Sequence, residues 1–147
     1  MLIRNATPAD LSICMDIRGR TKQNAIPKEV LESLGITVES WTVAMNEGNI
    51  IGNVSEVEGN VVGFTYGDTQ TGEVLVLAIL ADYEGKGIGK ALLETMVGRL
   101  KDLGHQRLWL ATASDPEMRS HGFYRKLGWT STGEFLENTD EILELFP

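Results

Sequence analysis

Residues 84–90, Glu-Gly-Lys-Gly-Ile-Gly-Lys, constrain the fold of this chain more than any other segment. They lie between an apolar run at residues 74–80, typical of a buried strand, and an amphipathic pattern at residues 88–103, typical of a helix. Glycines at alternate positions let the backbone approach a ligand closely, and the unpaired N–H groups of the following helix point into the same loop. This order favours a phosphate or pyrophosphate site, although a purely structural strand-to-helix turn can carry the same glycines.

The other patterns predict a mixed sheet with helices on its faces. Strands are predicted at residues 2–5, 50–57, 61–66, 74–80, 107–112, 130–135 and 141–146. Helices are predicted at residues 7–18, 27–34, 38–46, 88–103 and 116–127. Glu58-Gly59-Asn60 supplies the turn between the second and third strands.

Size and composition limit the class of protein. The 147 residues, with 42% hydrophobic and 23% charged, predict a single folded domain over residues 1–147. No apolar run approaches the roughly 20 residues of a membrane helix, and residues 1–5 lack a signal-peptide layout. One cysteine cannot form an internal disulfide, so we expect a cytoplasmic protein. The net charge of −8 argues against a nucleic-acid partner, and the two histidines and the cysteine lack metal-ligand spacing, so no metal is expected.

The glycine spacing excludes two phosphate-binding motifs. A P-loop that starts at Gly85 requires its second glycine at position 90, which is lysine. A dinucleotide fingerprint that uses Gly85 and Gly87 requires its third glycine at the same position. The loop therefore belongs to neither class.

Two segments resemble the signatures of the GNAT superfamily of acyl-CoA-dependent N-acyltransferases. The central motif of that family is Gln/Arg-x-x-Gly-x-Gly/Ala after a strand, and Glu84, Gly87 and Gly89 occupy its fixed positions. Residues 122–129, Gly-Phe-Tyr-Arg-Lys-Leu-Gly-Trp, resemble the second signature. The resemblance implies an α/β (α+β) GNAT fold over nearly the whole chain. That fold has a mixed, mostly antiparallel central sheet of six to seven strands, with about four to five helices on both faces.

The resemblance also implies acetyl-CoA as cosubstrate. Backbone groups of the fourth strand would pair with the pantetheine arm, at Leu77, Ala78 and Ile79. Backbone amides of the loop, with some lysine charge, would hold the pyrophosphate, at Gly85, Lys86, Gly87, Ile88, Gly89 and Lys90. Two positions depart from the family pattern. Glu84 stands where relatives carry Gln or Arg, and Glu117 stands where many carry an asparagine that contacts CoA.

Acyl transfer to an amine requires a base for the ammonium and an acid for the departing thiolate. Tyr124 matches the family tyrosine that protonates the thiolate; otherwise it is a core aromatic beside Phe123. Glu73, at the start of the fourth strand, resembles the glutamate that serves many relatives as base. Otherwise Glu73 is only a charged residue at the end of a strand, and a chain of water molecules can take the proton instead. Arg18 and Asn24 are candidate acceptor contacts in a segment that can equally be a solvated loop.

These residues predict an N-acetyltransferase that transfers the acetyl group of acetyl-CoA to a primary amine by direct attack in a ternary complex. The acceptor is either a small-molecule amine or a protein amine. The alternatives are a non-catalytic acyl-CoA-binding regulatory module and an acyltransferase with another acyl donor. Family members are often dimers, so a homodimer is an expectation.

Overall fold

A computed structural model describes all residues 1–147 as seven strands and five α-helices with two short 3-10 turns. The strands are β1 (Leu2–Asn5), β2 (Ile50–Val57), β3 (Asn60–Asp68), β4 (Val74–Ile79), β5 (Leu108–Thr112), β6 (Thr130–Phe135) and β7 (Glu141–Leu145). The helices are α1 (Leu11–Arg18), α2 (Lys28–Ser33), α3 (Val38–Asn46), α4 (Ile88–Asp102) and α5 (Arg119–Lys126). The 3-10 turns are η1 (Pro8–Asp10) and η2 (Ala81–Tyr83). None of the helices combines the length and apolar character that a membrane span requires.

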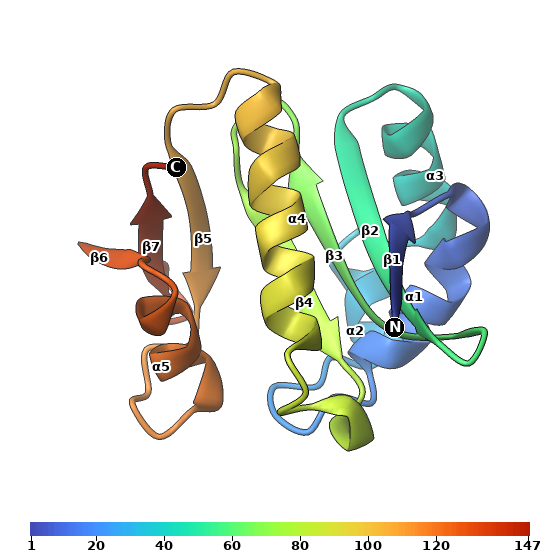
Figure 1. The fold of residues 1–147 in the computed structure, drawn as a ribbon, viewed down its shortest axis with the longest axis horizontal. Coiled ribbons are helices and arrows are strands. Elements are labelled where there is room, and N and C mark those ends of the chain that lie inside the picture. Colours follow the sequence, from blue (N-terminus) through green and yellow to red (C-terminus); the bar gives the residue numbers. More distant parts are fainter.

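The strands form two antiparallel sheets, with orders β1-β2-β3-β4 and β5-β7-β6. The two sheets meet at one isolated parallel bridge between Glu73 and Trp109. There the N–H of Trp109 donates to the carbonyl of Gly72 across 3.3 Å. The number of strands and helices is as predicted, and the single departure from a continuous mixed sheet is this junction, beyond which β4 and β5 separate (Figure 1).

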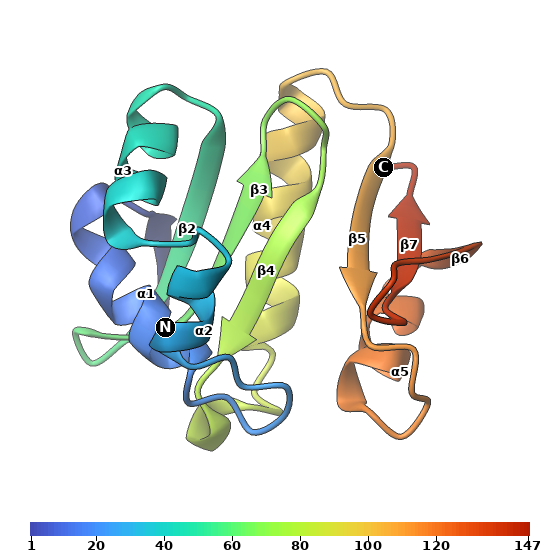
Figure 2. The same cartoon turned by 180° about the vertical axis from the view of Figure 1, so that it is seen from behind.

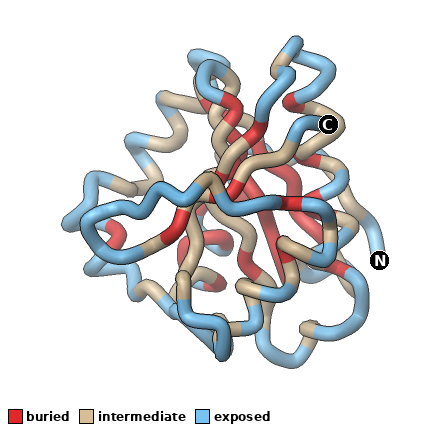
Figure 3. Tube along the Cα trace, turned by 90° about the vertical axis from the view of Figure 1, so that its left-hand side faces the viewer, coloured by how far each residue is buried: buried red, intermediate tan, exposed pale blue.

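Helices cover both faces of the four-stranded sheet (Figures 1 and 2). One face packs against α1 and α3, with a buried cluster that includes Leu11, Ile17, Val54 and Tyr66. The other face packs against α4, whose apolar side contributes to a second cluster: Val74, Leu93, Met96, Leu100, Leu108, Leu110, Tyr124, Trp129 and Leu143. The buried segments therefore run through the centre of the molecule while the loops at its ends are exposed (Figure 3).

Local turn chemistry explains most of the element boundaries. Glu58 and Gly59 both take positive φ, 53° and 81°, as a two-residue type I′ hairpin turn requires, and Asn60 pairs with Val57. Thr37 caps α3 by accepting the N–H of Ser40 at 3.0 Å, so this helix begins where the sequence predicts.

The predicted start of the last helix at residue 116 is wrong, because α5 begins at Arg119. Asp115 forms a turn first: its Oδ1 accepts the N–H of Glu117 at 2.9 Å and its carbonyl accepts the N–H of Met118 at 3.0 Å. Such an aspartate-led turn competes with the helix for the same backbone groups.

Two glycines offer a matched test of the packing between α3 and the sheet. A Cβ on Gly52 would lie 2.4 Å from Cε1 of Tyr66, a buried ring whose centroid is 5.0 Å from that of Trp41. Gly52→Ala should therefore destabilise the fold by about 1–3 kcal/mol. Gly98→Ala, on α4 with nothing within 4 Å, should stabilise it by about 0.5–1 kcal/mol. Urea unfolding of both variants checks this, and equal midpoints would contradict the packing.

Candidate active site

The separation of β4 from β5 opens a cleft of about 650 Å³. Strand β4 pairs with β3 along one edge only, so beyond the bridge at Glu73 its other edge has no strand partner. The predicted pantetheine-binding residues Leu77, Ala78 and Ile79 all line this cleft. An unpaired strand edge presents backbone N–H and C=O groups to a ligand that contains amides.

The glycine loop forms one end of the same cleft. Gly85 and Gly87 have φ of 76° and 82°, so both positions need a residue that tolerates the left-handed region. Gly87 is also the N-cap residue of α4, a 15-residue helix whose first N–H groups face the loop. Gly89 and Lys90 also line the cleft. The bare backbone and the positive end of the helix dipole make this end of the cleft attractive to an anion such as a phosphate group.

Two of the predicted loop residues turn away from the cleft. The side chain of Ile88 is 4% exposed and packs with Val62 and Leu92, so only its backbone belongs to the loop surface. The ammonium of Lys86 lies over the ring of Tyr83, 5.5 Å from its centroid. Neither side chain lines the cleft.

Tyr124 lies in the wall of the cleft, on α5. Its ring is 8% exposed and packs edge-on against Phe123 and Trp129, at centroid distances of 5.1 and 6.2 Å. The hydroxyl has no hydrogen-bond partner in the chain, and no side-chain polar atom is buried without one, so the hydroxyl opens to the cleft. Burial raises the pKa of Tyr124 to about 12, with the positive charge of Arg18 opposing the shift. The phenol therefore holds its proton at neutral pH.

Glu73 lines the cleft at the junction of the two sheets. Its backbone is fixed, since its carbonyl accepts the N–H of Asp68 at 2.8 Å, while its carboxylate forms no ion pair or hydrogen bond. Burial, and then the negative charge of Asp68, raise the pKa of Glu73 from 4.5 to about 7. A carboxyl with this pKa exchanges protons readily at neutral pH, as a general base must.

The predicted acceptor contacts Arg18 and Asn24 also line the cleft. The guanidinium of Arg18 donates to the carbonyl of Asn24 at 2.6 Å and has no carboxylate partner. Burial lowers the pKa of Arg18. Asn138 and Asp140, from the loop between β6 and β7, reach the cleft as well. No motif points to these last two residues, because only the fold brings the end of the chain beside residues 18–24.

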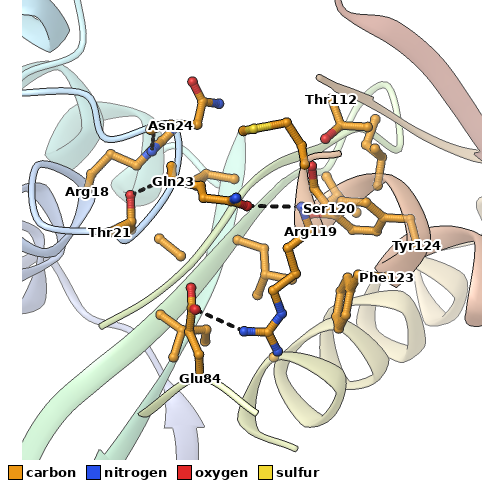
Figure 4. Close-up of a pocket in the computed structure, with 18 of the residues that line it drawn as sticks. Arg18, Thr21, Gln23, Asn24, Glu84, Thr112, Arg119, Ser120, Phe123 and Tyr124 are labelled. Atoms are coloured by element: carbon orange, nitrogen blue, oxygen red, sulfur yellow. Dashed lines mark hydrogen bonds and ion pairs between the residues drawn. The ribbon is translucent and has the colours of Figure 1, made fainter. Parts of the chain in front are cut away.

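Glu84, the unusual member of the loop, is paired across the cleft. Its carboxylate lies 3.0 Å from the guanidinium of Arg119, the first residue of α5. The backbone N–H of Arg119 in turn donates to Oε1 of Gln23 at 2.9 Å. Figure 4 shows these contacts joining three distant segments around the opening. The sequence marks position 84 as unusual and gives no sign of the arginine that compensates it.

Two other reactive side chains lie apart from the chemistry. Cys14 is 2% exposed in the core on α1, and burial raises the pKa of its thiol to about 12. This residue cannot supply a thiolate nucleophile at neutral pH. His121 does not line the cleft; its Nε2 lies 4.0 Å from Glu141, which is paired with Arg125. No group of three or more His, Cys, Asp or Glu side chains is arranged to hold a metal ion.

The structure thus combines a mixed α/β fold, a glycine loop at one end of a cleft, and a phenol and a carboxylate in the cleft that have no hydrogen-bond partner. The chain belongs to the acetyltransferase (GNAT) family, whose model matches residues 14–129. This confirms the resemblance drawn from Glu84, Gly87 and Gly89 and from residues 122–129.

Individual relatives agree with this family. The chain is 34% identical over 91 residues to the [ribosomal protein bS18]-alanine N-acetyltransferase of Haemophilus influenzae, covering 60% of the chain and 61% of that protein. It is 28% identical over 120 residues to human N-acetyltransferase 8B, covering 82% of the chain and 50% of that protein. It therefore spans half to three-fifths of these relatives' lengths. The crystal structure of PaiA N-acetyltransferase from Thermoplasma acidophilum in complex with coenzyme A superposes with a TM-score of 0.80, at 21% identity and full coverage of both chains.

The raised pKa of Glu73 predicts a pH-dependent stability. Because the folded state holds the proton more tightly than the unfolded state, Glu73 lowers stability as pH rises from about 4.5 through about 7. Glu73→Gln should therefore gain stability relative to the wild type over this range and keep a constant advantage above it. Urea unfolding at pH 5, 6, 7 and 8 measures the difference. Glu134→Gln, which removes an exposed carboxyl on β6, is the matched control, and a parallel profile for both variants would contradict the shift.

Proposed function

We propose that the chain is an N-acetyltransferase that moves the acetyl group of acetyl-CoA to a primary amine by direct attack in a ternary complex. The observation that carries this proposal is the presence of two unengaged proton-transfer groups, Tyr124 and Glu73, in the cleft that ends at the glycine loop. Cys14 is buried away from the cleft, which favours direct transfer over a covalent cysteine intermediate.

The cleft fits the parts of CoA in order. Leu77, Ala78 and Ile79 would pair with the amide-bearing pantetheine arm through the free edge of β4. The bare loop at Gly85, Gly87 and Gly89 would hold the pyrophosphate through backbone N–H groups. Ile88 would contribute its backbone N–H group, and Lys86 and Lys90 would add positive charge. The relative from Thermoplasma acidophilum, which is in complex with coenzyme A, has the same fold. When bound, acetyl-CoA supplies the activated acetyl group.

Each proton step has a residue suited to it. Glu73, with a pKa of about 7, would take a proton from the acceptor ammonium, directly or through one water. Tyr124, with a pKa of about 12, would keep its proton at neutral pH and so present an O–H group that can donate to the departing thiolate. The buried ring of Tyr124 fixes the position of that hydroxyl against Phe123 and Trp129.

The far half of the cleft would hold the acceptor amine. Arg18, a cation without a carboxylate partner, would bind an anionic or carbonyl group of the acceptor, and Asn24 borders the same space. The Haemophilus influenzae relative is named for transfer to an alanine of a ribosomal protein, which supports including peptides with an amino-terminal alanine among the acceptors. CoA release from acetyl-CoA should be measured with a panel of such peptides, free amino acids, polyamines and aminoglycosides. Binding of acetyl-CoA without turnover on any amine would favour the regulatory-module alternative.

Tyr124→Phe separates the chemical step from binding. The substitution removes only the hydroxyl, so turnover with the best acceptor of the panel should fall by roughly 10²–10⁴-fold. The dissociation constant for CoA, measured by calorimetry, should stay within about twofold, because the ring keeps its packing. Turnover equal to that of the wild type would show that Tyr124 is not the general acid.

Glu73→Gln should alter the pH dependence of the reaction. In the wild type, kcat/KM should rise with pH through an inflection near 7, where the Glu73 carboxyl loses its proton. The variant should lose this inflection and run roughly 10²–10⁴-fold slower at pH 8, while the titration of the acceptor amine remains in both profiles. A variant that keeps the inflection near pH 7 would show that another group is the base.

A further inference from the structure

The ion pair between Arg119 and Glu84 occupies the phosphate end of the cleft. Both residues line the cleft with Gly85, Gly87 and Gly89. The guanidinium reaches Glu84 from the first turn of α5, across the opening, as Figure 4 shows. The cation is therefore held beside the loop by a residue of that loop.

Stability does not explain this pair. The side chain of Arg119 is 49% exposed, and ion pairs this open to water contribute little to folding. The pair also places a carboxylate where the proposed ligand would bring negative phosphates. Without a neighbouring cation, Glu84 would repel that ligand.

The guanidinium has capacity for another partner. Arginine presents five N–H donors in a planar fork, and the only ion pair that Arg119 makes is the 3.0 Å contact with Glu84. The other cations of the loop are less well placed, since Lys86 lies over Tyr83 and Lys90 is 3.9 Å from Glu94. A fork of this kind matches the oxygens of a phosphate group.

The position of α5 directs Arg119 towards the loop. Phe123, one helical turn later on the same side of α5, lies against Gly89, where an added Cβ would be 3.5 Å from its Cζ. At the start of the helix, Gln23 accepts the backbone N–H of Arg119 and fixes the first turn. Two contacts on α5 and one from Glu84 therefore define where the guanidinium lies.

We propose that Arg119 binds the pyrophosphate of CoA and that Glu84 holds its guanidinium in place for that contact. Arg119 thus supplies from α5 the positive charge that position 84 lacks, and Glu84 is a positioning residue whose own charge is neutralised. This assignment rests on the proposed function, because it assumes that the glycine loop binds the pyrophosphate of CoA.

Calorimetric titration of the full chain with CoA and dephospho-CoA tests the contact. Both ligands carry the pyrophosphate, and only CoA carries the 3′-phosphate. Arg119→Ala should weaken both by the same factor, roughly ten- to a hundredfold, as expected for a charge-assisted hydrogen bond, and Arg119→Lys should weaken both less. Lys126→Ala, which removes an exposed cation from the same helix outside the cleft, should leave both affinities unchanged. A loss confined to CoA, or no loss, would overturn the assignment.

A double-mutant cycle tests the part played by Glu84. If Glu84 positions Arg119, removing Arg119 should cost affinity in the Glu84→Gln background too, by a smaller factor than in the wild type. If removing Arg119 in the Glu84→Gln background causes no loss of affinity, Arg119 only neutralises Glu84. If the loss equals that in the wild type, Glu84 does not position Arg119. Either result overturns the proposal. A wild-type chain that binds neither ligand would refute the proposed function itself.

Discussion

The single bridge between Glu73 and Trp109 is the contact on which the cleft depends. The two sheets can meet this closely because Gly72 has no side chain: an added Cβ would lie 2.9 Å from the carbonyl oxygen of Arg107 and 3.2 Å from the ring of His105. Since β4 and β5 touch at their starts and separate afterwards, one pair of parallel strands provides both a rigid junction and an open edge. The site lies between two buried clusters, so its opening requires no cavity in either core.

Burial sets the protonation of the two groups assigned to the chemistry. Burial raises the pKa of both Glu73 and Tyr124, yet the consequences differ because their ordinary values differ. The carboxyl moves up to about 7, where it can accept and release a proton, whereas the phenol moves further from neutrality and remains an acid. Burial therefore suits Glu73 to its proposed role as base and keeps the proton on Tyr124.

The fold was largely predictable because each element carries a local signal. The helical period and the Thr37 cap define α3, and the Glu58-Gly59 turn defines the β2–β3 hairpin, since these interactions lie within a few residues of one another. The start of α5 was misplaced because the side chain and carbonyl of Asp115 form a turn that competes with helix formation. In the cleft, residues of the two signatures could be identified, but Gln23, Asn138 and Asp140 could not. Their place depends on packing between segments that lie far apart in the sequence, which leaves no periodicity in it.

Glu84 shows why a departure from a motif must be judged in three dimensions. Considered alone, a carboxylate at the phosphate end of a loop opposes binding, and a guanidinium or amide at that position would favour it. In the fold, Arg119 lies 3.0 Å away and neutralises the carboxylate, and the remaining N–H donors of its guanidinium are the ones proposed to reach the pyrophosphate. A cation on a neighbouring helix can thus offset an unfavourable charge at a motif position. The net charge and the donor geometry at the loop therefore belong to the folded cleft rather than to residue 84 alone.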